Sequence, residues 1–217
     1  MPVRAVLFDL DGTLLNTLAD IAAATNDALK ELGLAEHPVA AYRGFVGSGI
    51  RVLAERALGS EANEKRIESV IATAGRRMGE NTFTRPYSGV TELLAKLQDR
   101  YVLGILSNKP QEIVGHTVER FLPGVSFAAV VGQRVGVPEK PDPAMAHNMM
   151  HVLGVVPADV VYLGDSDVDM MTATNTGMFG VGAAWGFRGR SELERSGAGA
   201  VIDHPNELLP LLEERGA

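Results

Sequence analysis

The chain contains no cysteine among its 217 residues. It therefore has no disulfide bond, no thiol nucleophile and no thiolate metal ligand, which fits a reducing compartment. Basic residues are the minority: 20 lysines and arginines stand against 27 aspartates and glutamates, for a net charge of -7. This balance argues against a surface for nucleic acid or for an anionic membrane, although a local basic pocket for a small anion stays open.

Long apolar runs are also absent from the sequence. No run approaches the ~20 residues needed to span a bilayer, and Asp9 and Asp11 interrupt the apolar stretch where a signal peptide would need one. We therefore expect a soluble, cytoplasmic protein. The 46% hydrophobic and 22% charged residues are ordinary for a globular chain, and the length allows one large domain or a core domain with a smaller one.

The sequence does contain short apolar runs with the character of β-strands. The four stronger runs are AVLFDL, YVLGILS, SFAAVVG and DVVYLGD, and two weaker ones, MFGVGAA and GAVI, follow. Helical patterns such as VTELLAKLQD, QEIVGHTVERFL and PAMAHNMMHVLG separate most of them. Continuous apolar strands that alternate with helices indicate a parallel sheet with both faces covered. The predicted fold is α/β, with a doubly wound, mostly parallel, Rossmann-like sheet whose sites form at the carboxyl ends of the strands.

One segment interrupts this alternation soon after the first strand. It contains no convincing strand and only helical patterns, such as LADIAAATNDALKELG, GIRVLAERALG and ANEKRIESVIATAGRRMGE. The simplest account is a helical subdomain that can cover the strand ends as a lid. The predicted domains are an α/β core, residues 1–16 and 84–217, and a helical cap, residues 17–83.

Polar residues follow each strand that is expected to end at the active edge. In an open α/β sheet these ends converge on one crevice. The pooled side chains are carboxylates, lysines and small hydroxyls. They are Asp9, Asp11 and Thr13 after the first strand, Ser107, Asn108 and Lys109 after the second, Lys140 in PEKPDP, and Asp165, Asp167 and Asp169 in GDSDVD.

These residue types suit phosphoryl transfer. Clustered carboxylates raise one another's pKa or require a cation, and oxygen ligands favour a hard ion such as Mg²⁺. Lysine and hydroxyl donors then need an anionic partner, and a phosphoryl group fits. Neither a Walker loop nor a G-x-G-x-x-G motif is present, so the nucleophile is a carboxylate or water. Asp9 and Asp11 share a face of an extended strand, which lets one attack while the other handles protons.

Four motifs, in this order, resemble those of a known family: DLDGTL, SNK, the lysine of EKPDP, and GDSDVD. With the helical segment after the first of them, nearly the whole chain resembles the haloacid dehalogenase superfamily of phosphatases, in particular its phosphoglycolate-phosphatase-like branch with a helical cap. The resemblance implies that Asp9 is the nucleophile that becomes phosphorylated. It makes Asp11 the general acid for the leaving oxygen and then the base that activates water.

The resemblance also implies the remaining roles at the site. Lys140 and Ser107 hold the phosphoryl oxygens, and Thr13 steadies the loop around Asp11. The expected substrate contacts of the core are Thr13, Ser107 and Asn108. The implied Mg²⁺ site involves Asp9, the backbone carbonyl of Asp11, Asp165 directly and Asp169 through water. Ser107 stands where many relatives have threonine, a departure that changes little.

The stretch FVGSGIRVL in the expected cap has two compatible interpretations. It is a helix start with Ser48 as the N-cap and flexible glycines around it. It is also a candidate anion site, because exposed amides at a helix start bind anions and a basic side chain is near. The resemblance supports substrate contacts here, so Gly47, Ser48, Gly49 and Arg51 are candidate substrate-binding residues.

Three other patterns have structural explanations. DSDVDM lacks the glycine and the glutamate of an EF-hand, since Met170 and Thr176 occupy those positions; Asp167 is then a solvent-side residue at a helix start. His147 and His151 have the spacing of a zinc motif without its glutamate, which favours an ordinary helix. WGFR, residues 185–188, is expected to serve core packing.

The sequence thus predicts a Mg²⁺-dependent phosphomonoester hydrolase for a small phosphorylated metabolite, with an aspartyl-phosphate at Asp9. Phosphoglycolate is the leading candidate substrate, because its carboxylate could bind the VGSG amides while its phosphate binds Ser107 and Lys140. A phosphomutase of the β-phosphoglucomutase type shares every core residue, and a non-catalytic regulatory protein that keeps the fold is the third alternative. Dehalogenation is disfavoured, because it does not require Asp11. The physiological substrate and the oligomeric state stay open.

Overall fold

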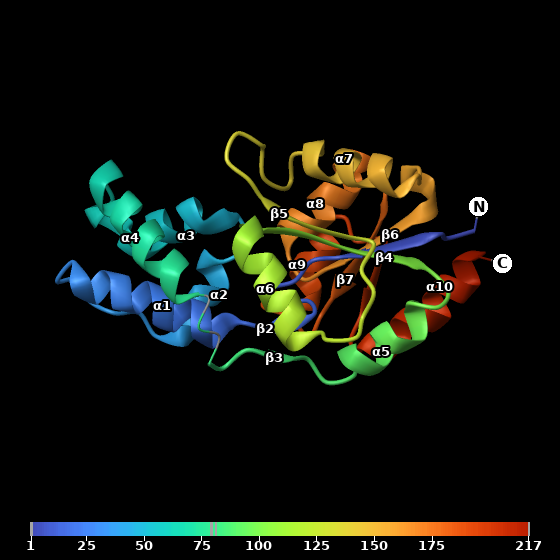
Figure 1. Ribbon diagram of the computed structural model, residues 1–217, viewed down its shortest axis with the longest axis horizontal. Helices are drawn as coiled ribbons and strands as arrows, with labels where there is room; N and C mark the ends of the chain where they lie inside the picture. Colours follow the sequence, from blue (N-terminus) through green and yellow to red (C-terminus); the bar gives the residue numbers. More distant parts are fainter. Residues whose placement is uncertain (1, 79, 81, 217) are drawn as a thin grey trace.

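The computed structural model describes residues 2–78, 80 and 82–216, and its centre is a parallel sheet (Figure 1). The sheet has six strands in the order β5-β4-β1-β6-β7-β8, and every neighbouring pair is parallel. This arrangement confirms the predicted doubly wound α/β fold. The strands are β1 (Ala5–Phe8), β4 (Val102–Pro110), β5 (Ala129–Gln133), β6 (Val160–Gly164), β7 (Phe179–Ala183) and β8 (Ala200–Ile202).

The central strand β1 explains where the site forms. It lies between β4 and β6, with Phe8 opposite Ile105 on one side and Leu163 on the other. All four of its residues are fully buried, as expected for a strand covered on both faces. The chain therefore leaves the sheet at Asp9, at the same edge where β6 ends.

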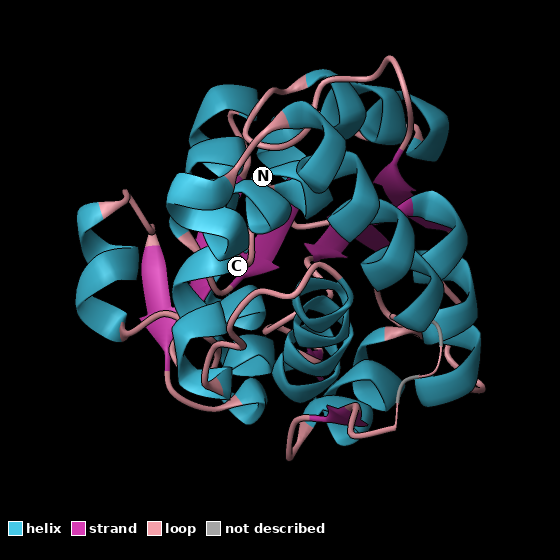
Figure 2. Cartoon of the chain, turned by 90° about the vertical axis from the view of Figure 1, so that its left-hand side faces the viewer, coloured by secondary structure: helices cyan, strands magenta, loops and turns pink. Residues whose placement is uncertain are grey.

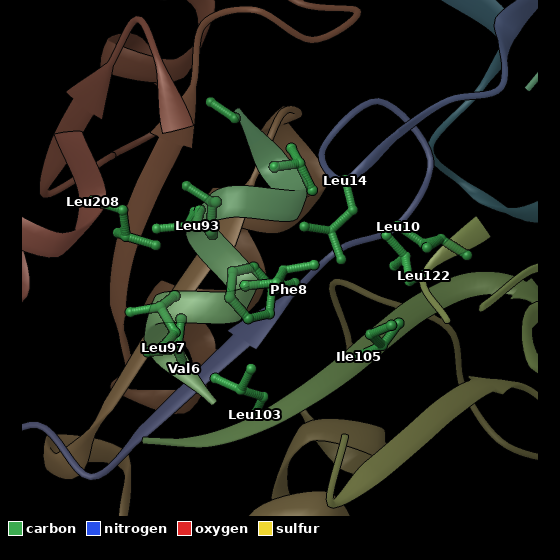
Figure 3. Close-up of a cluster of buried hydrophobic side chains, with 14 of the residues drawn as sticks. Val6, Phe8, Leu10, Leu14, Leu93, Leu97, Leu103, Ile105, Leu122 and Leu208 are labelled. Atoms are coloured by element: carbon green, nitrogen blue, oxygen red, sulfur yellow. The ribbon is translucent and has the colours of Figure 1, made fainter. Parts of the chain in front are cut away.

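Alternate residues of β1 face the two apolar layers of the core. Val6 and Phe8 belong to a cluster with Leu93 and Leu97 (Figure 3), whereas Ala5 and Leu7 belong to a separate cluster on the opposite face. Figure 1 shows α7 and α8 on one side of the sheet and α5 and α10 on the other. The helices of the core are α5 (Val90–Leu97), α6 (Gln111–Phe121), α7 (Ala144–Leu153), α8 (Asp167–Thr176), α9 (Arg190–Arg195) and α10 (Leu208–Gly216), with 3₁₀ turns at Pro157–Asp159 and Pro205–Glu207.

The helical insert, residues 17–83, lies beyond one edge of the sheet, and Figure 2 views the molecule from that side. It has apolar clusters of its own, formed mainly between its helices. The two linkers to the core run side by side as a short antiparallel pair, with Leu15 opposite Pro86. The elements are β2 (Leu15–Asn16), α1 (Leu18–Glu31), α2 (Tyr42–Phe45), α3 (Gly49–Leu58), α4 (Glu64–Arg77) and β3 (Arg85–Pro86), with 3₁₀ turns at Val39–Ala41 and Gly59–Glu61.

One buried carboxylate connects the first helix of the insert to the segment that precedes β3. Asp20, in the first turn of α1, accepts hydrogen bonds from the backbone amides of Thr82, Phe83 and Thr84 at 2.6–3.0 Å. It also accepts one from the Thr84 hydroxyl at 2.6 Å. The division into an α/β core and a helical cap stays a prediction. Within the described ranges, no helix has the length and apolar character needed to cross a membrane.

Candidate active site

A pocket lies between the strand ends and the helical insert. It brings together residues from five core segments and from the helical insert. Of the residues predicted from sequence, it is lined by Asp9, Asp11, Ser107, Asn108, Lys140, Asp165, Asp169, Gly47 and Gly49. Further lining residues are Ile21, Val46, Ile50, Leu53, Met78, Lys109, Pro110, Ser166, Phe187 and Arg188.

A buried lysine is the centre of the site. The Nζ atom of Lys140 donates hydrogen bonds at 2.8 Å to Oδ1 of Asp9, to Oδ1 of Asp169 and to the Tyr162 hydroxyl. All three protons of the ammonium group are thereby used. Tyr162 is a fully buried residue of β6, and the sequence analysis missed it because a tyrosine in an apolar strand is an ordinary core residue.

Asp165 is enclosed by two backbone segments. Its Oδ2 accepts a hydrogen bond from the Phe187 amide at 2.6 Å, and its Oδ1 accepts one from the Thr13 hydroxyl at 3.4 Å. A Cβ atom on Gly12 or Gly186 would lie 2.3 or 2.2 Å from atoms of Asp165. Only glycine therefore lets these two loops approach the carboxylate.

Three buried carboxylates lie close together, and Lys140 bonds two of them. One oxygen from each of Asp9, Asp165 and Asp169 lies within 4.8 Å of the others. Burial, reinforced by the charge of Asp169 and opposed by Lys140, raises the pKa of Asp9 to about 7. Burial, reinforced by the charges of Asp169 and Asp9, raises the pKa of Asp165 well above its usual range. Burial lowers the pKa of Lys140, but the charges of Asp169 and Asp9 more than offset this, so the pKa lies above its ordinary value.

This excess of carboxylates fits a bound cation. The donor atoms are all oxygens, which suits a hard ion such as Mg²⁺ rather than a softer metal. The alternative way to relieve the charge is to keep a proton on a carboxylate, as the raised pKa values indicate. His147 and His151 take no part in the group, because both are exposed on α7.

The carboxylate of Asp11 stands apart from this group. Its two oxygens are 3.0 and 3.1 Å from Nζ of Lys109, a residue of β4 whose side chain is only 4% exposed. Asp11 therefore lines the pocket as a carboxylate paired with Lys109, whereas Lys140 pairs with Asp9 and Asp169. The sequence predicted that Lys109 lies at the strand end but assigned it no role. Nothing in the SNK motif shows which carboxylate the lysine contacts.

Asn108 is fully occupied by protein partners. Its Nδ2 donates to the carbonyl of Gly47 in the insert at 3.1 Å and to the carbonyl of Lys140 at 2.9 Å. Its Oδ1 accepts from the Lys140 amide at 2.7 Å. Both side-chain protons are used, so Asn108 joins the insert to the lysine loop. Its neighbour Ser107 lines the pocket and accepts a hydrogen bond from the Lys109 amide.

The start of α8 is built into the site. Ser166 and Asp169 form a capping box: the Ser166 hydroxyl and amide donate to Oδ2 of Asp169 at 2.6 and 3.1 Å, and Ser166 Oγ accepts from the Asp169 amide at 3.4 Å. One oxygen of Asp169 thus caps the helix while the other meets Lys140. Asp167 begins the helix and is partly exposed.

The predicted cap residues divide into two groups. Gly47 and Gly49 line the pocket, but Ser48, Arg51 and also Thr13 of the core are not among its lining residues. The guanidinium of Arg51 is exposed and pairs with both oxygens of Glu64 at 2.8 and 3.2 Å. Ser48 occupies the N-cap position of α3, but its side chain makes no capping hydrogen bond.

The WGFR loop contributes more than the expected core packing. Trp185 does pack against the core, and its Nε1 donates to the Thr13 carbonyl at 2.9 Å. Phe187 and Arg188, however, line the pocket. The prediction of core packing was therefore incomplete. The available signal was the position of the loop, which follows a strand at the active edge.

Comparisons with known proteins identify relatives in sequence and in fold. Residues 6–183 match the family described as haloacid dehalogenase-like hydrolase. The chain is 31% identical over 214 residues to the phosphoglycolate phosphatase of Pseudomonas putida, covering 95% of this chain and 79% of that protein. A candidate phosphoglycolate phosphatase from Lactobacillus delbrueckii has a TM-score of 0.90 and 31% identity, covering 98% of this chain and 99% of that one.

A second solved structure gives the same result. The predicted phosphoglycolate phosphatase from Haemophilus somnus has a TM-score of 0.88 and 28% identity, and the match covers 96% of this chain and 97% of that one. The shared fold therefore includes the insert as well as the sheet. The family match spans most of the sequence, and the chain belongs to the haloacid dehalogenase-like hydrolases.

Proposed function

We propose that the protein is a Mg²⁺-dependent phosphomonoester hydrolase that acts on a small phosphorylated metabolite, with 2-phosphoglycolate as the leading candidate. The observation that carries the proposal is the contact between Lys140 Nζ and Asp9, with a second, separately held carboxylate, Asp11, in the same pocket. The names of the relatives support the choice of substrate.

Asp9 is placed to act as the nucleophile. Lys140 fixes its Oδ1, and among the described residues none donates a hydrogen bond to its Oδ2. In the first step the carboxylate forms a bond to phosphorus, and the bond from phosphorus to the leaving oxygen breaks. Asp11, which must take up a proton from solvent before this step, gives that proton to the leaving oxygen. In the second step Asp11 takes a proton from water, the water oxygen attacks phosphorus, and free phosphate and the Asp9 carboxylate are released.

The charge at the site requires a cation for this chemistry. Asp9 and Asp165 would hold Mg²⁺ with Asp169 and the Asp11 carbonyl in support, and the ion would neutralise charge between the carboxylates and the phosphoryl group. Lys140 orients Asp9 and neutralises part of the same charge. The helical insert, which closes one side of the pocket with apolar residues, limits the access of water.

Phosphate release from a panel of small phosphomonoesters tests the proposal. The panel includes 2-phosphoglycolate and β-glucose 1-phosphate, each with and without Mg²⁺, for the wild type, Asp9→Asn and Asp167→Asn. We expect Mg²⁺-dependent turnover that Asp9→Asn abolishes and that Asp167→Asn, a partly exposed aspartate of the same motif, retains.

The outcomes separate the candidate functions. Turnover that persists in Asp9→Asn would exclude Asp9 as the nucleophile. Conversion of β-glucose 1-phosphate to an isomer, rather than release of phosphate, would favour a phosphomutase. An inactive wild type would favour a non-catalytic protein.

A further inference from the structure

We infer that Arg188 recognises an anionic group on the leaving-group side of the substrate. The substrate class is then small phosphomonoesters that carry a carboxylate, or a second anionic group, close to the phosphate. This inference rests on the proposed function and adds to it a specificity-determining residue.

The helical insert supplies no charged side chain to the pocket in its described part. Its lining residues are apolar or glycine: Ile21, Val46, Gly47, Gly49, Ile50, Leu53 and Met78. A substrate anion can therefore be bound only by backbone amides of the insert or by side chains of the core.

The start of α3 is an unfavourable place for that anion. Two carbonyls of the segment are turned to donors of the core: Val46 accepts from Arg188 Nη2 at 3.3 Å, and Gly47 accepts from Asn108 at 3.1 Å. The carboxylate of Glu139 lies against Gly49, where a Cβ atom would be 2.2 Å from Oε2. A negative charge already at this helix start repels a second one.

Most cationic charge of the pocket is already committed to carboxylates. Lys140 bonds Asp9 and Asp169, and Lys109 bonds both oxygens of Asp11. Neither ammonium group can bind a substrate carboxylate without giving up a partner on which the site depends. The remaining cationic side chain among the described lining residues is Arg188.

Arg188 keeps binding capacity that the lysines lack. Its carboxylate partner, Glu192, lies at 3.4 Å from Nε and is itself 37% exposed. Its Nη2 bonds a neutral carbonyl. The Arg188 side chain is nevertheless only 18% exposed, so its charge is partly desolvated. A planar guanidinium in that state binds a carboxylate strongly and with defined geometry.

The neighbouring residue fixes Arg188 relative to the reaction centre. The amide of Phe187 holds Asp165 at 2.6 Å, and its buried ring packs in the apolar cluster of the insert. The backbone before Arg188 is therefore anchored to the predicted metal ligand on one side and to the insert on the other. Arg188 and the proposed nucleophile Asp9 line the same pocket.

The test compares two esters of equal length. 2-Phosphoglycolate carries a carboxylate where 2-hydroxyethyl phosphate carries a neutral CH₂OH group. We expect Arg188→Gln to lower kcat/KM for 2-phosphoglycolate by about 10–100-fold, chiefly through KM, because a charge-assisted hydrogen bond to the substrate is lost. The same variant should change kcat/KM for 2-hydroxyethyl phosphate by less than about threefold. Arg188→Lys keeps the positive charge but loses the planar guanidinium that can donate two parallel hydrogen bonds. Its kcat/KM for 2-phosphoglycolate should lie between those of the wild type and Arg188→Gln.

Arg190→Gln is the matched control. Arg190 lies two residues further along the chain, and its guanidinium pairs with Asp203 and Glu194 at the surface. Both esters should be hydrolysed by this variant as by the wild type. Melting curves of all variants verify folding.

The outcomes distinguish this inference from the proposed function. A wild type that hydrolyses neither ester contradicts the proposed function itself. If the wild type hydrolyses 2-phosphoglycolate but Arg188→Gln lowers kcat/KM equally for both esters, or for neither, only the role of Arg188 is overturned.

Discussion

The two sides of the pocket differ in the kind of residue that they present. The core side carries charged and polar side chains at the ends of parallel strands, among them Asp9, Asp11, Lys109 and Lys140, and their polar groups are bonded to one another. The side formed by the insert presents apolar residues such as Ile50 and Leu53, and glycine backbone. The chemistry thus comes from the sheet, and the insert determines shape and access.

The physical reason lies in how each region is buried. A parallel sheet covered on both faces has no room for polar side chains except at the strand ends, so its charges gather there. The helices of the insert, in contrast, gain stability by packing apolar residues against each other, and the pocket receives the edge of that packing.

Removal of Lys140 should have the largest effect on the core side. Lys140→Met leaves Asp9 and Asp169 buried without their cation. We expect the free energy of unfolding to fall by about 3–5 kcal/mol without Mg²⁺, and turnover to be lost. Urea denaturation in the presence of a chelator measures the first effect and phosphate release the second.

A surface ion pair provides the control for this prediction. Arg100 pairs with Glu213 at 2.8 Å, but both side chains are about half exposed. Arg100→Gln should therefore lower the free energy of unfolding far less than Lys140→Met. If the two variants lost the same free energy of unfolding, burial would not determine how strongly the Lys140 contacts stabilise the protein.

The pH dependence of stability is a second way to test the charged side. The pKa of Asp9 rises from 3.8 to about 7 in the folded protein. Between these values the folded state keeps a proton that the unfolded chain has lost, so the free energy of unfolding falls as the pH rises from about 4 to about 7. The raised pKa of Asp165 acts in the same direction.

Denaturation curves across this range, with a chelator and with Mg²⁺, measure the effect. Mg²⁺ should reduce the decline, because a bound cation stabilises the ionised carboxylates. Asp9→Asn should flatten the curve recorded with the chelator. An unchanged slope in that variant would show that Asp9 does not keep the proton.

The same contrast explains what the sequence could predict. Strand ends follow from apolar runs, so Asp9 and Asp165 could be assigned to one edge before the structure was known. The pairing of Asp11 with Lys109, and of Lys140 with Tyr162, depends on side-chain directions across neighbouring strands, which no local pattern encodes.

Residues of the insert are harder to assign, because their orientation depends on how whole helices pack. Arg51 has the sequence position of a substrate contact, yet its guanidinium meets Glu64 on the exposed surface. Arg188 belongs to WGFR, for which the sequence predicted core packing, but the loop after β7 places it in the pocket. Helical periodicity gives the apolar face of a helix, not the rotation of that helix over a distant site.

Asn108 connects the two sides, and its loss should have an intermediate effect. Asn108→Ala leaves the carbonyl of Gly47 and both backbone groups of Lys140 without their side-chain partner. We expect a loss of about 1–3 kcal/mol in the free energy of unfolding, with a lower kcat because the Lys140 loop is no longer held.

A second asparagine that bonds the Lys140 loop is the control. Asn175, an exposed residue of α8, donates to the carbonyl of Pro141 at 2.9 Å. Asn175→Ala should retain kcat and most of the stability. If both alanine variants lowered kcat alike, a general loosening of the loop would explain the result better than a link between the insert and the core.

The smallest expected effect comes from two serines that stand at helix starts on opposite sides of the pocket. Ser166 caps α8 through its hydrogen bonds with Asp169, whereas Ser48 precedes α3 without a capping bond. In chelator-treated protein, Ser166→Ala should therefore lower the free energy of unfolding by about 1–2 kcal/mol. Ser48→Ala should lower it by less than about 0.5 kcal/mol. Urea denaturation of both variants measures the difference. Equal costs would mean that Ser48 caps α3 in solution, and the start of α3 would then be as firmly fixed as the core side.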